Sequence, residues 1–428
     1  MQTVIDRKNA PSRADIQKIN VPQAEKHTLD NGIPVYAINA GFQDLVKVEL
    51  LFTNPEFNAA KPLMNSATNR MLPEGTSKYN SQQLADLIDY YGAFFETDEN
   101  SDFCSVMLYS LNKYLGQTLP YIREMLTEPS FPENELSVYK KNHKQRLIVD
   151  NEKVGSLARR KFNQIIFGND HPYGFMVQPD DYDALNREDL MAFHKLKYSP
   201  SNCVLIVSGM INADTIQMLN KNFGSWKNEN VKLNFNRPAF QTEKEFKHYV
   251  KKDGAIQSAI RIGKPFFNRS HEDYPGVAVA NTLLGGYFGS RLMSNIREDK
   301  GYTYGIGSAI VSMKQEGYFF ISTEVGAKVT NDALREIYSE IELMRSETVE
   351  EEELEMVRNY MLGTFLKGID GAFQLAERFK SIYLSGLDYG YYDRYLAKIR
   401  TIGPDEVLSL SRKYFDPAGF HELVVGLK

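Results

Sequence analysis

The chain has 428 residues, of which 42% are hydrophobic, 25% charged and 12% aromatic, a composition typical of a folded globular protein. At roughly 150 residues per domain, this length predicts two large domains or about three of average size. The 50 Lys and Arg residues against 55 Asp and Glu residues give a net charge of −5, so nucleic acid is not an expected partner. Cys104 and Cys203 are too few for a disulfide framework, and they favour a reducing compartment.

The first 30 residues are rich in charged and polar side chains and contain no apolar stretch typical of a secretory signal. The longest apolar runs, such as Cys203–Val207, are much shorter than the roughly 20 residues that span a bilayer. We therefore expect a cytoplasmic protein with no transmembrane segment and no membrane partner.

Strands and helices are predicted to alternate within each half of the chain. Residues 32–38 and 46–52 are rich in β-branched residues and predict two strands that form a hairpin. A helix follows, capped at Asn80 or Ser81 and stopped at Gly92, with apolar residues at helical spacing between them. The pattern predicts an α+β fold, in which each of two similar domains is a mainly antiparallel sheet with helices packed on one face.

A duplication is indicated by two similar segments, residues 193–209 and 411–426. Each contains a helix end, a tyrosine, a proline-marked turn and an apolar strand closed by glycine. Their tyrosines lie 216 positions apart and their closing glycines 217, whereas a looser match of residues 26–32 with 247–254 gives an offset of 221. Two copies of a domain of about 200 residues account for these offsets, because solenoid repeats are much shorter.

The predicted join is the polar, proline-containing stretch at residues 229–242, which has no sustained helical or strand period. The predicted organisation is therefore an N-terminal extension at 1–21, a first domain at 22–228, the linker at 229–242 and a second domain at 243–428.

Residues 284–304, with the sequence LGGYFGSRLMSNIREDKGYTY, resemble the second-domain signature of the insulinase and pitrilysin family of zinc peptidases, which includes the mitochondrial processing peptidase. Residues 167–174 resemble the His-Pro-Tyr-Gly turn of that family, and residues 198–209 resemble the last strand of its first domain. The resemblance extends from about residue 22 to the C-terminus. It implies a two-domain peptidase-like fold.

Active members of that family carry the zinc motif H-x-x-E-H on a first-domain helix. Registration on Gly75-Thr76 places Ser66 and Arg70 at the two His positions and Asn69 at the Glu position. Serine is a poor zinc ligand, asparagine cannot take a proton from water, and arginine keeps its positive charge. The third ligand of the family would fall within residues 136–149, which contain no Asp or Glu. The resemblance therefore implies a degenerate zinc motif, with no metal and no cofactor in this chain.

The second-domain signature, by contrast, is complete. The residues that match the substrate-contacting pair of the family are Arg297 and Tyr304. A guanidinium can donate to peptide carbonyls, and a phenol can donate to the oxyanion that forms when water attacks. Taken alone, the two residues favour a structural interpretation, with Arg297 as a charged residue near a helix C-terminus and Tyr304 as a half-buried strand residue. The family match favours the functional interpretation.

A lost zinc motif beside a complete substrate-contacting pair implies that another chain supplies the metal. The resemblance predicts the non-zinc subunit of a heterodimeric zinc endopeptidase, inactive alone, that offers Arg297 and Tyr304 to a peptide held by the partner. The expected partners are a zinc-bearing homologous subunit and a peptide or unfolded polypeptide, and a homodimer can form in the subunit's absence. The alternative is a non-enzymatic peptide-binding or structural scaffold protein of the same fold.

Overall fold

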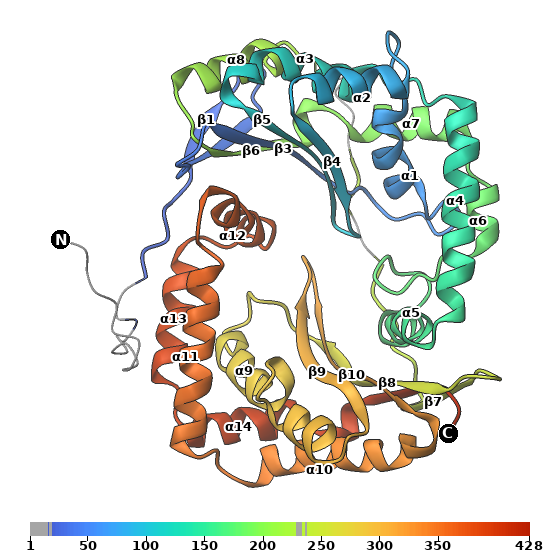
Figure 1. Ribbon diagram of the computed structural model, residues 1–428, viewed down its shortest axis with the longest axis vertical. Coiled ribbons are helices and arrows are strands. Elements are labelled where there is room, and N and C mark those ends of the chain that lie inside the picture. Colours follow the sequence, from blue (N-terminus) through green and yellow to red (C-terminus); the bar gives the residue numbers. More distant parts are fainter. Residues whose placement is uncertain (1–15, 17–18, 228–232, 236–237) are drawn as a thin grey trace, which may run out of the picture.

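The computed structural model describes residue 16 and residues 19–227, 233–235 and 238–428. Within these residues the chain forms two sheets that face each other, each with helices on its outer face (Figure 1). The predicted α+β class is confirmed. Among the described residues, no helix is both long and apolar enough to cross a bilayer.

The first sheet comes from the N-terminal half and is antiparallel except where its second and sixth strands run parallel. Its order is β1 (Glu25–Thr28), β2 (Pro34–Asn39), β6 (Cys203–Gly209), β3 (Leu45–Thr53), β5 (Phe103–Leu111) and β4 (Phe94–Glu99). The helices that share its outer hydrophobic core are α1 (Met64–Met71), α2 (Ser81–Tyr90), α3 (Asn112–Thr127), α4 (Glu133–Glu152), α7 (Arg187–Lys197) and α8 (Ala213–Phe223), while the short α6 (Pro179–Asp183) lies against α4.

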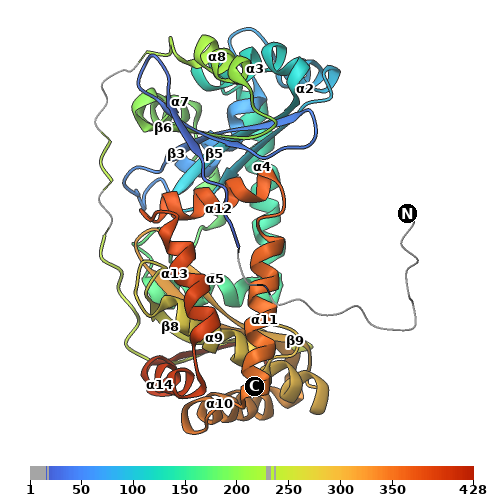
Figure 2. The same ribbon diagram turned by 90° about the vertical axis from the view of Figure 1, so that its left-hand side faces the viewer.

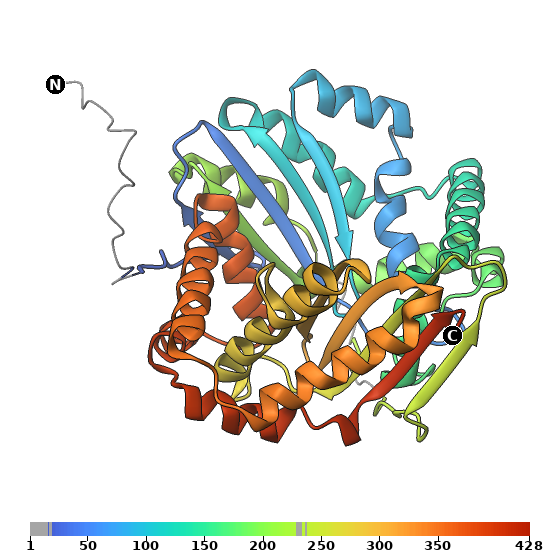
Figure 3. The same cartoon turned by 60° about the horizontal axis from the view of Figure 1, so that its bottom comes forward.

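The second sheet comes from the C-terminal half. Its order is β7 (Lys247–Lys251), β11 (His421–Gly426), β8 (Gln257–Phe266), β10 (Gly317–Gly326) and β9 (Thr303–Ser312), and again one pair, β7 with β11, is parallel. The helices of this half are α9 (Tyr274–Asn281), α10 (Thr330–Ser346), α11 (Glu351–Lys367), α13 (Gly390–Thr401) and α14 (Pro404–Tyr414). Figure 3, with this end of the molecule turned forward, shows the gold α9 and the orange α10 lying across the second sheet.

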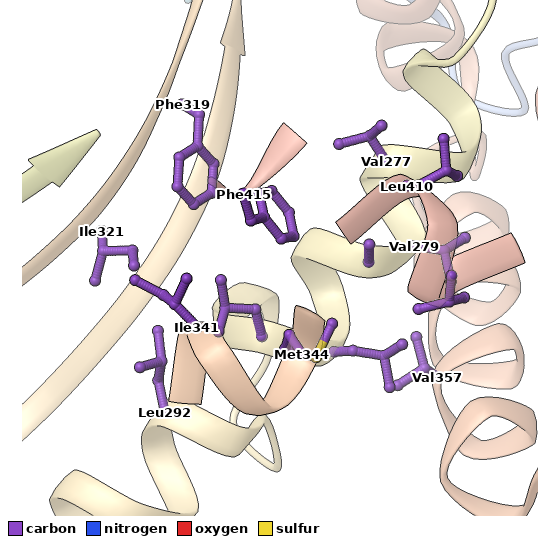
Figure 4. Close-up of a cluster of buried hydrophobic side chains, with 14 of the residues drawn as sticks. Val277, Val279, Leu292, Phe319, Ile321, Ile341, Met344, Val357, Leu410 and Phe415 are labelled. Atoms are coloured by element: carbon purple, nitrogen blue, oxygen red, sulfur yellow. The ribbon is translucent and has the colours of Figure 1, made fainter. Parts of the chain in front are cut away.

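The core of the second half lies between its sheet and these helices. Figure 4 shows buried residues of β10, α9, α10, α11 and α14 converging on one cluster, in which the rings of Phe319 and Phe415 are stacked with centroids 5.0 Å apart. Both phenylalanines are fully buried. Because each fully buried apolar side chain contributes about 1.5 to 3 kcal/mol, this cluster is a main source of the stability of this half.

The strand order repeats from one sheet to the other, since β2-β6-β3-β5-β4 matches β7-β11-β8-β10-β9 in order and direction. The equivalent strands β6 and β11 end at glycines 217 positions apart. Leu205 of β6 and Glu422 of β11 are equivalent positions at this offset of 217. Leu205 pairs with Val35 of β2 and Glu422 pairs with Lys247 of β7, so β2 and β7 are equivalent at an offset of 212. The looser match of residues 26–32 with 247–254, at 221, was therefore wrong, because it aligned β1 rather than β2 with β7. The domain boundaries stay predictions, and residues 228–232 and 236–237, most of them in the predicted linker, lie outside the described residues.

The predicted hairpin of the second and third strands was also wrong. Both strands form, but β6 lies between β2 and β3 and bonds to each of them. The predicted helix is confirmed as α2, where the side chain of Asn80 accepts from the backbone N–H of Gln83 and the Gln83 side chain accepts from the N–H of Asn80.

Two helices are exchanged between the halves. Helix α5 (Val154–Phe167) comes from the first half but packs on β8 and β11 of the second sheet, whereas α12 (Ala372–Leu384) comes from the second half and packs on β6 and β2 of the first. The two helices end 217 positions apart, so they are equivalent elements of the repeat. Both lie between the sheets, and Figure 2 shows α12 directly beneath the first sheet. Each sheet is thus covered on its inner face as well as on the predicted outer face.

Candidate functional site

The degenerate zinc motif lies on α1, which packs against β4, β5 and α7. Asn69, at the position of the catalytic Glu, is fully buried. Its Nδ2 donates to the carbonyl oxygens of Asp98 and Ser105, at 2.9 and 3.3 Å, and the hydroxyl of Tyr198 donates to its Oδ1 at 2.9 Å. Asn69 therefore has the contacts of a structural residue that ties α1 to the strands beneath it and leaves no amide group free for a water molecule.

Arg70, at the second His position, forms a fork-like contact with one carboxylate oxygen. Its Nε and Nη2 donate to Oε1 of Glu99 on β4, at 2.9 and 2.7 Å. Burial by itself would lower the pKa of Arg70, but the hydrogen bond and charge of Glu99 outweigh it and raise that pKa. The positive charge is thus fixed beside the position where a metal ion would lie.

Helix α4 presents a phenol and an imidazole to this part of α1. Tyr139 and His143 are one turn apart, with ring centroids separated by 4.2 Å, and Tyr139 contacts the hydroxyl of Ser66. Burial raises the pKa of Tyr139. Burial, followed by the positive charges of Arg70 and Arg146, lowers the pKa of His143.

These side chains do not fit a zinc ion. Zinc sites in proteins use thiolate, imidazole and carboxylate ligands, and the replaced motif offers only a hydroxyl, an amide and a guanidinium. His143 is the one conventional ligand on the facing part of α4, and Arg70 would repel a divalent cation. Across the described residues, no group of three or more His, Cys, Asp or Glu side chains is placed to hold a metal ion.

Arg297 and Tyr304 lie at the other sheet, on two segments that pack together. Tyr304 is on β9, and 93% of its surface is exposed, so the half-buried position considered from sequence alone does not apply. Arg297 lies in a π-helical turn, Met293–Asp299, and its guanidinium carbon is 4.6 Å from the ring centroid of Phe288. Within the described part of the chain, neither side chain forms an ion pair or a hydrogen bond.

Unusual backbone geometry holds this region together. A second π-helical turn, Thr282–Gly286, precedes the glycine-rich loop, and such turns are frequent at functional sites. The N–H of Tyr302 donates to the carbonyl of Ile296 at 3.0 Å, which closes the connection between the π turn Met293–Asp299 and β9. A Cβ atom on Gly285 would lie 2.6 Å from the backbone nitrogen of Ser308. Only glycine allows this close approach to β9, so the loop is built to hold its shape.

The two sets of predicted residues thus belong to opposite layers of the molecule. Ser66, Asn69 and Arg70 pack with the first sheet, whereas Arg297 and Tyr304 are carried by the second (Figure 1). The sequence interpretation missed three residues that shape these positions. Glu99 and Tyr139 could not be found, because distant elements bring them to α1, whereas Phe288 could have been noticed as an aromatic residue inside the signature segment.

Two facing α+β layers built on the same strand order define a duplicated, peptidase-like architecture, in which side chains bonded to their own fold replace the zinc motif. Residues 184–361 match the family model described as Peptidase M16 inactive domain. The predicted resemblance to the insulinase and pitrilysin family of zinc peptidases is therefore confirmed.

Relatives at low identity agree with this assignment. The chain is 22% identical over 364 residues to a Bacillus subtilis protein described as uncharacterized zinc protease YmxG, covering 84% of this chain and 87% of that protein. It is 23% identical over 309 residues to the probable inactive metalloprotease YmfF of the same organism, covering 70% and 71%.

Solved structures confirm the fold alone. The M16 inactive domain from Pseudomonas fluorescens superimposes with a TM-score of 0.84 at 20% identity, over 95% of this chain and 98% of that one. A protease from Helicobacter pylori gives a TM-score of 0.85 at 18% identity, over 94% and 99%.

Proposed function

We propose that this chain is the non-zinc subunit of a heterodimeric zinc endopeptidase, inactive alone, and that it lends Arg297 and Tyr304 to a zinc-bearing homologous partner. The observation that carries the proposal is a contrast between two positions. Asn69 and Arg70 are fully engaged with their own fold, whereas Arg297 and Tyr304 have no polar partner among the described residues. Side chains held without a partner on a shaped surface are available to a second molecule.

The chemistry of the pair suits peptide hydrolysis. A partner that covers Tyr304 would shield the Tyr304 phenol from water. The hydrogen bond from this phenol to a developing oxyanion would then be stronger. Arg297 offers fixed donors to the carbonyl groups of a peptide. Its contact with the ring of Phe288 already restricts the side chain, so less conformational entropy is lost when a peptide binds. Zinc held by the partner would supply an activated water molecule.

The expected substrate is a peptide or an unfolded polypeptide, which can bind as an added strand along a sheet edge. We place the protein in the cytoplasm, because Cys104 and Cys203 are both buried free thiols, which persist in reducing compartments. A homodimer can form when the zinc-bearing subunit is absent.

The test is to mix this chain with a candidate zinc-bearing subunit and to measure peptide hydrolysis. Tyr304→Phe should lower kcat by about 10² to 10³, the effect of removing one oxyanion donor. Tyr90→Phe is the matched control, because Tyr90 is also highly exposed, at 82%, but lies on α2 of the first layer. An unchanged rate with Tyr304→Phe would remove this residue from the mechanism.

The alternative is a non-enzymatic peptide-binding or structural scaffold of the same fold. The Arg70–Glu99 contact, which occupies the second His position of the zinc motif, is also consistent with that function. It predicts no partner-dependent hydrolysis. Purification from the native source separates the two functions, because a zinc-containing chain of similar size should copurify with a peptidase subunit. Stoichiometric zinc in this chain alone, with hydrolysis abolished by a chelator, would contradict both.

A further inference from the structure

A buried thiol and a buried amine meet between β5 and α7. Cys104 and Lys197 are both fully buried, 93 positions apart in the chain, and the distance from Lys197 Nζ to Cys104 Sγ is 2.7 Å. Hydrogen bonds from N–H to oxygen have a typical length of about 2.9 to 3.0 Å, and sulfur is the larger acceptor atom. The separation is therefore short for a simple hydrogen bond to sulfur.

Apart from the thiol, the hydrogen-bond partners of Lys197 are uncharged side-chain amides, and the charge of Glu99 acts on it from beyond ion-pair distance. Its Nζ also contacts Oδ1 of Asn54 at 2.7 Å and Oδ1 of Asn65 at 2.9 Å. Among the described residues, no carboxylate forms an ion pair with it. A buried ammonium ion without a carboxylate is costly, so the neutral amine is favoured.

Burial lowers the pKa of Lys197 and raises the pKa of Cys104. Both directions favour an amine with a free lone pair beside a protonated thiol over an ammonium–thiolate pair.

We propose that Cys104 and Lys197 are a site of oxidative cross-linking, in which one oxygen atom joins Sγ to Nζ. The oxidant is dioxygen, whose O–O bond breaks. One oxygen forms the new S–O and N–O bonds, and the other leaves as water with the thiol proton and one amine proton. Sulfur and nitrogen each give up two electrons, which supplies the four electrons that reduce dioxygen.

A route for a small oxidant is present beside the pair. A pocket of about 650 Å³ between α1 and α7 is lined by Asn65, the residue that contacts Lys197, and by Leu196. Dioxygen that enters this pocket therefore meets Asn65, whose side chain is in direct contact with the amine.

The cross-link would tie β5 to the end of α7. Asn54, just after β3, and Asn65 on α1 contact the same amine. A covalent bond here would therefore hold the N-terminus of α1, where Asn65 lies, in place. Helix α1 also carries Asn69 and Arg70. It would also restrict the unfolded chain by closing a long loop, which raises stability.

The experiment uses the full chain, purified under reductant and then divided into reduced and air-exposed samples. We expect the air-exposed chain to gain one oxygen atom and lose two hydrogen atoms in intact mass. A peptide map should find residues 104 and 197 in one linked species. Excess dithiol should release it, and the linked chain should melt several degrees above the reduced chain.

Cys104→Ser and Lys197→Met should each abolish this species, whereas Cys203→Ser is the matched control, because Cys203 is equally buried with no lysine contact. The wild-type peptide map decides the question even where a variant does not fold. Gain of one or more whole oxygen atoms at Cys104 with no link to Lys197 would overturn the proposal. A mass change that excess dithiol does not reverse would also overturn the proposal, because lysine methylation, for example, is not reversed by a dithiol.

Discussion

Lys47 of β3 donates to Glu377 of α12 over 2.7 Å, although the two residues are 330 positions apart and come from opposite halves of the chain. Lys380 of α12 continues the contact, at 2.9 Å from Glu49 and 2.8 Å from Glu377. Lys47 also lies 3.0 Å from Glu49. Two positive and two negative charges thus alternate at the inner face of the first sheet, and they hold the exchanged helix α12 in place.

Replacing the buried carboxylate of this network should destabilise the fold strongly. Glu49 is 1% exposed, and Glu49→Gln would leave two buried lysines with Glu377 as their one carboxylate. Removal of one partner from a buried charge network costs about 3 to 5 kcal/mol, and we expect a loss of that size in urea unfolding. Glu406→Gln, which breaks a half-exposed pair with Lys398, should cost about 1 kcal/mol or less. Equal losses would mean that the network does not hold α12.

The position that matches the catalytic Glu should prove to be structural. In Asn69→Asp, a carboxylate would face the carbonyl oxygens of Asp98 and Ser105 in a fully buried position, and both donated hydrogen bonds would be lost. We expect the free energy of unfolding to fall by about 3 kcal/mol or more. Asn58→Asp, on an exposed loop, should change it by about 0.5 kcal/mol or less. If Asn69→Asp leaves the free energy of unfolding nearly unchanged, the surroundings of residue 69 are open to water.

The sequence predicts best what neighbouring residues determine. Helix α2 was predicted because its capping residue and apolar period are local, and the lost zinc motif was recognised because Ser66, Asn69 and Arg70 show their chemistry by residue type alone. Strand β6 could not be placed between β2 and β3, because local β-propensity does not say which distant strand fills a gap.

The exchange of α5 and α12 has the same cause. Each helix buries an apolar face against a sheet from the other half, and the local sequence pattern predicts that apolar face without saying which sheet will cover it. The Arg70–Glu99 contact is likewise invisible in the sequence, because the strand that carries Glu99 reaches α1 only in the folded chain.

The glycine-rich loop before Arg297 should not accept a side chain at Gly285. Because a Cβ atom there would lie 2.6 Å from the backbone of Ser308, Gly285→Ala must displace either the loop or β9. We expect a loss of about 1 to 3 kcal/mol in thermal or urea unfolding, the usual cost of overpacking. Gly305→Ala on β9 is the matched control, since nothing lies within 4 Å of its added Cβ, and it should leave stability nearly unchanged. Similar behaviour of the two variants would contradict a tightly packed loop.

The stability of the first half should fall in mild acid because of His194. Its Nε2 contacts the carbonyl oxygen of Leu126 at 2.9 Å, and its ring stacks on Tyr198 with centroids 5.1 Å apart. Burial lowers the pKa of His194 to about 4. An unfolded histidine has a pKa of about 6.5, so between these values the unfolded chain binds a proton that the folded chain excludes.

The contribution of neutral His194 is therefore present above about pH 6.5 and is lost as the pH falls toward 4. Because the ring is not completely buried, we expect a loss of about 1 to 2 kcal/mol between pH 7 and pH 5. His194→Gln cannot titrate but can still donate to Leu126, and its urea unfolding should lack this part of the pH dependence. His248→Gln, on the edge strand β7, should behave as the wild type does. If His194→Gln and the wild type lose the same stability at pH 5, protonation of other groups causes the acid effect.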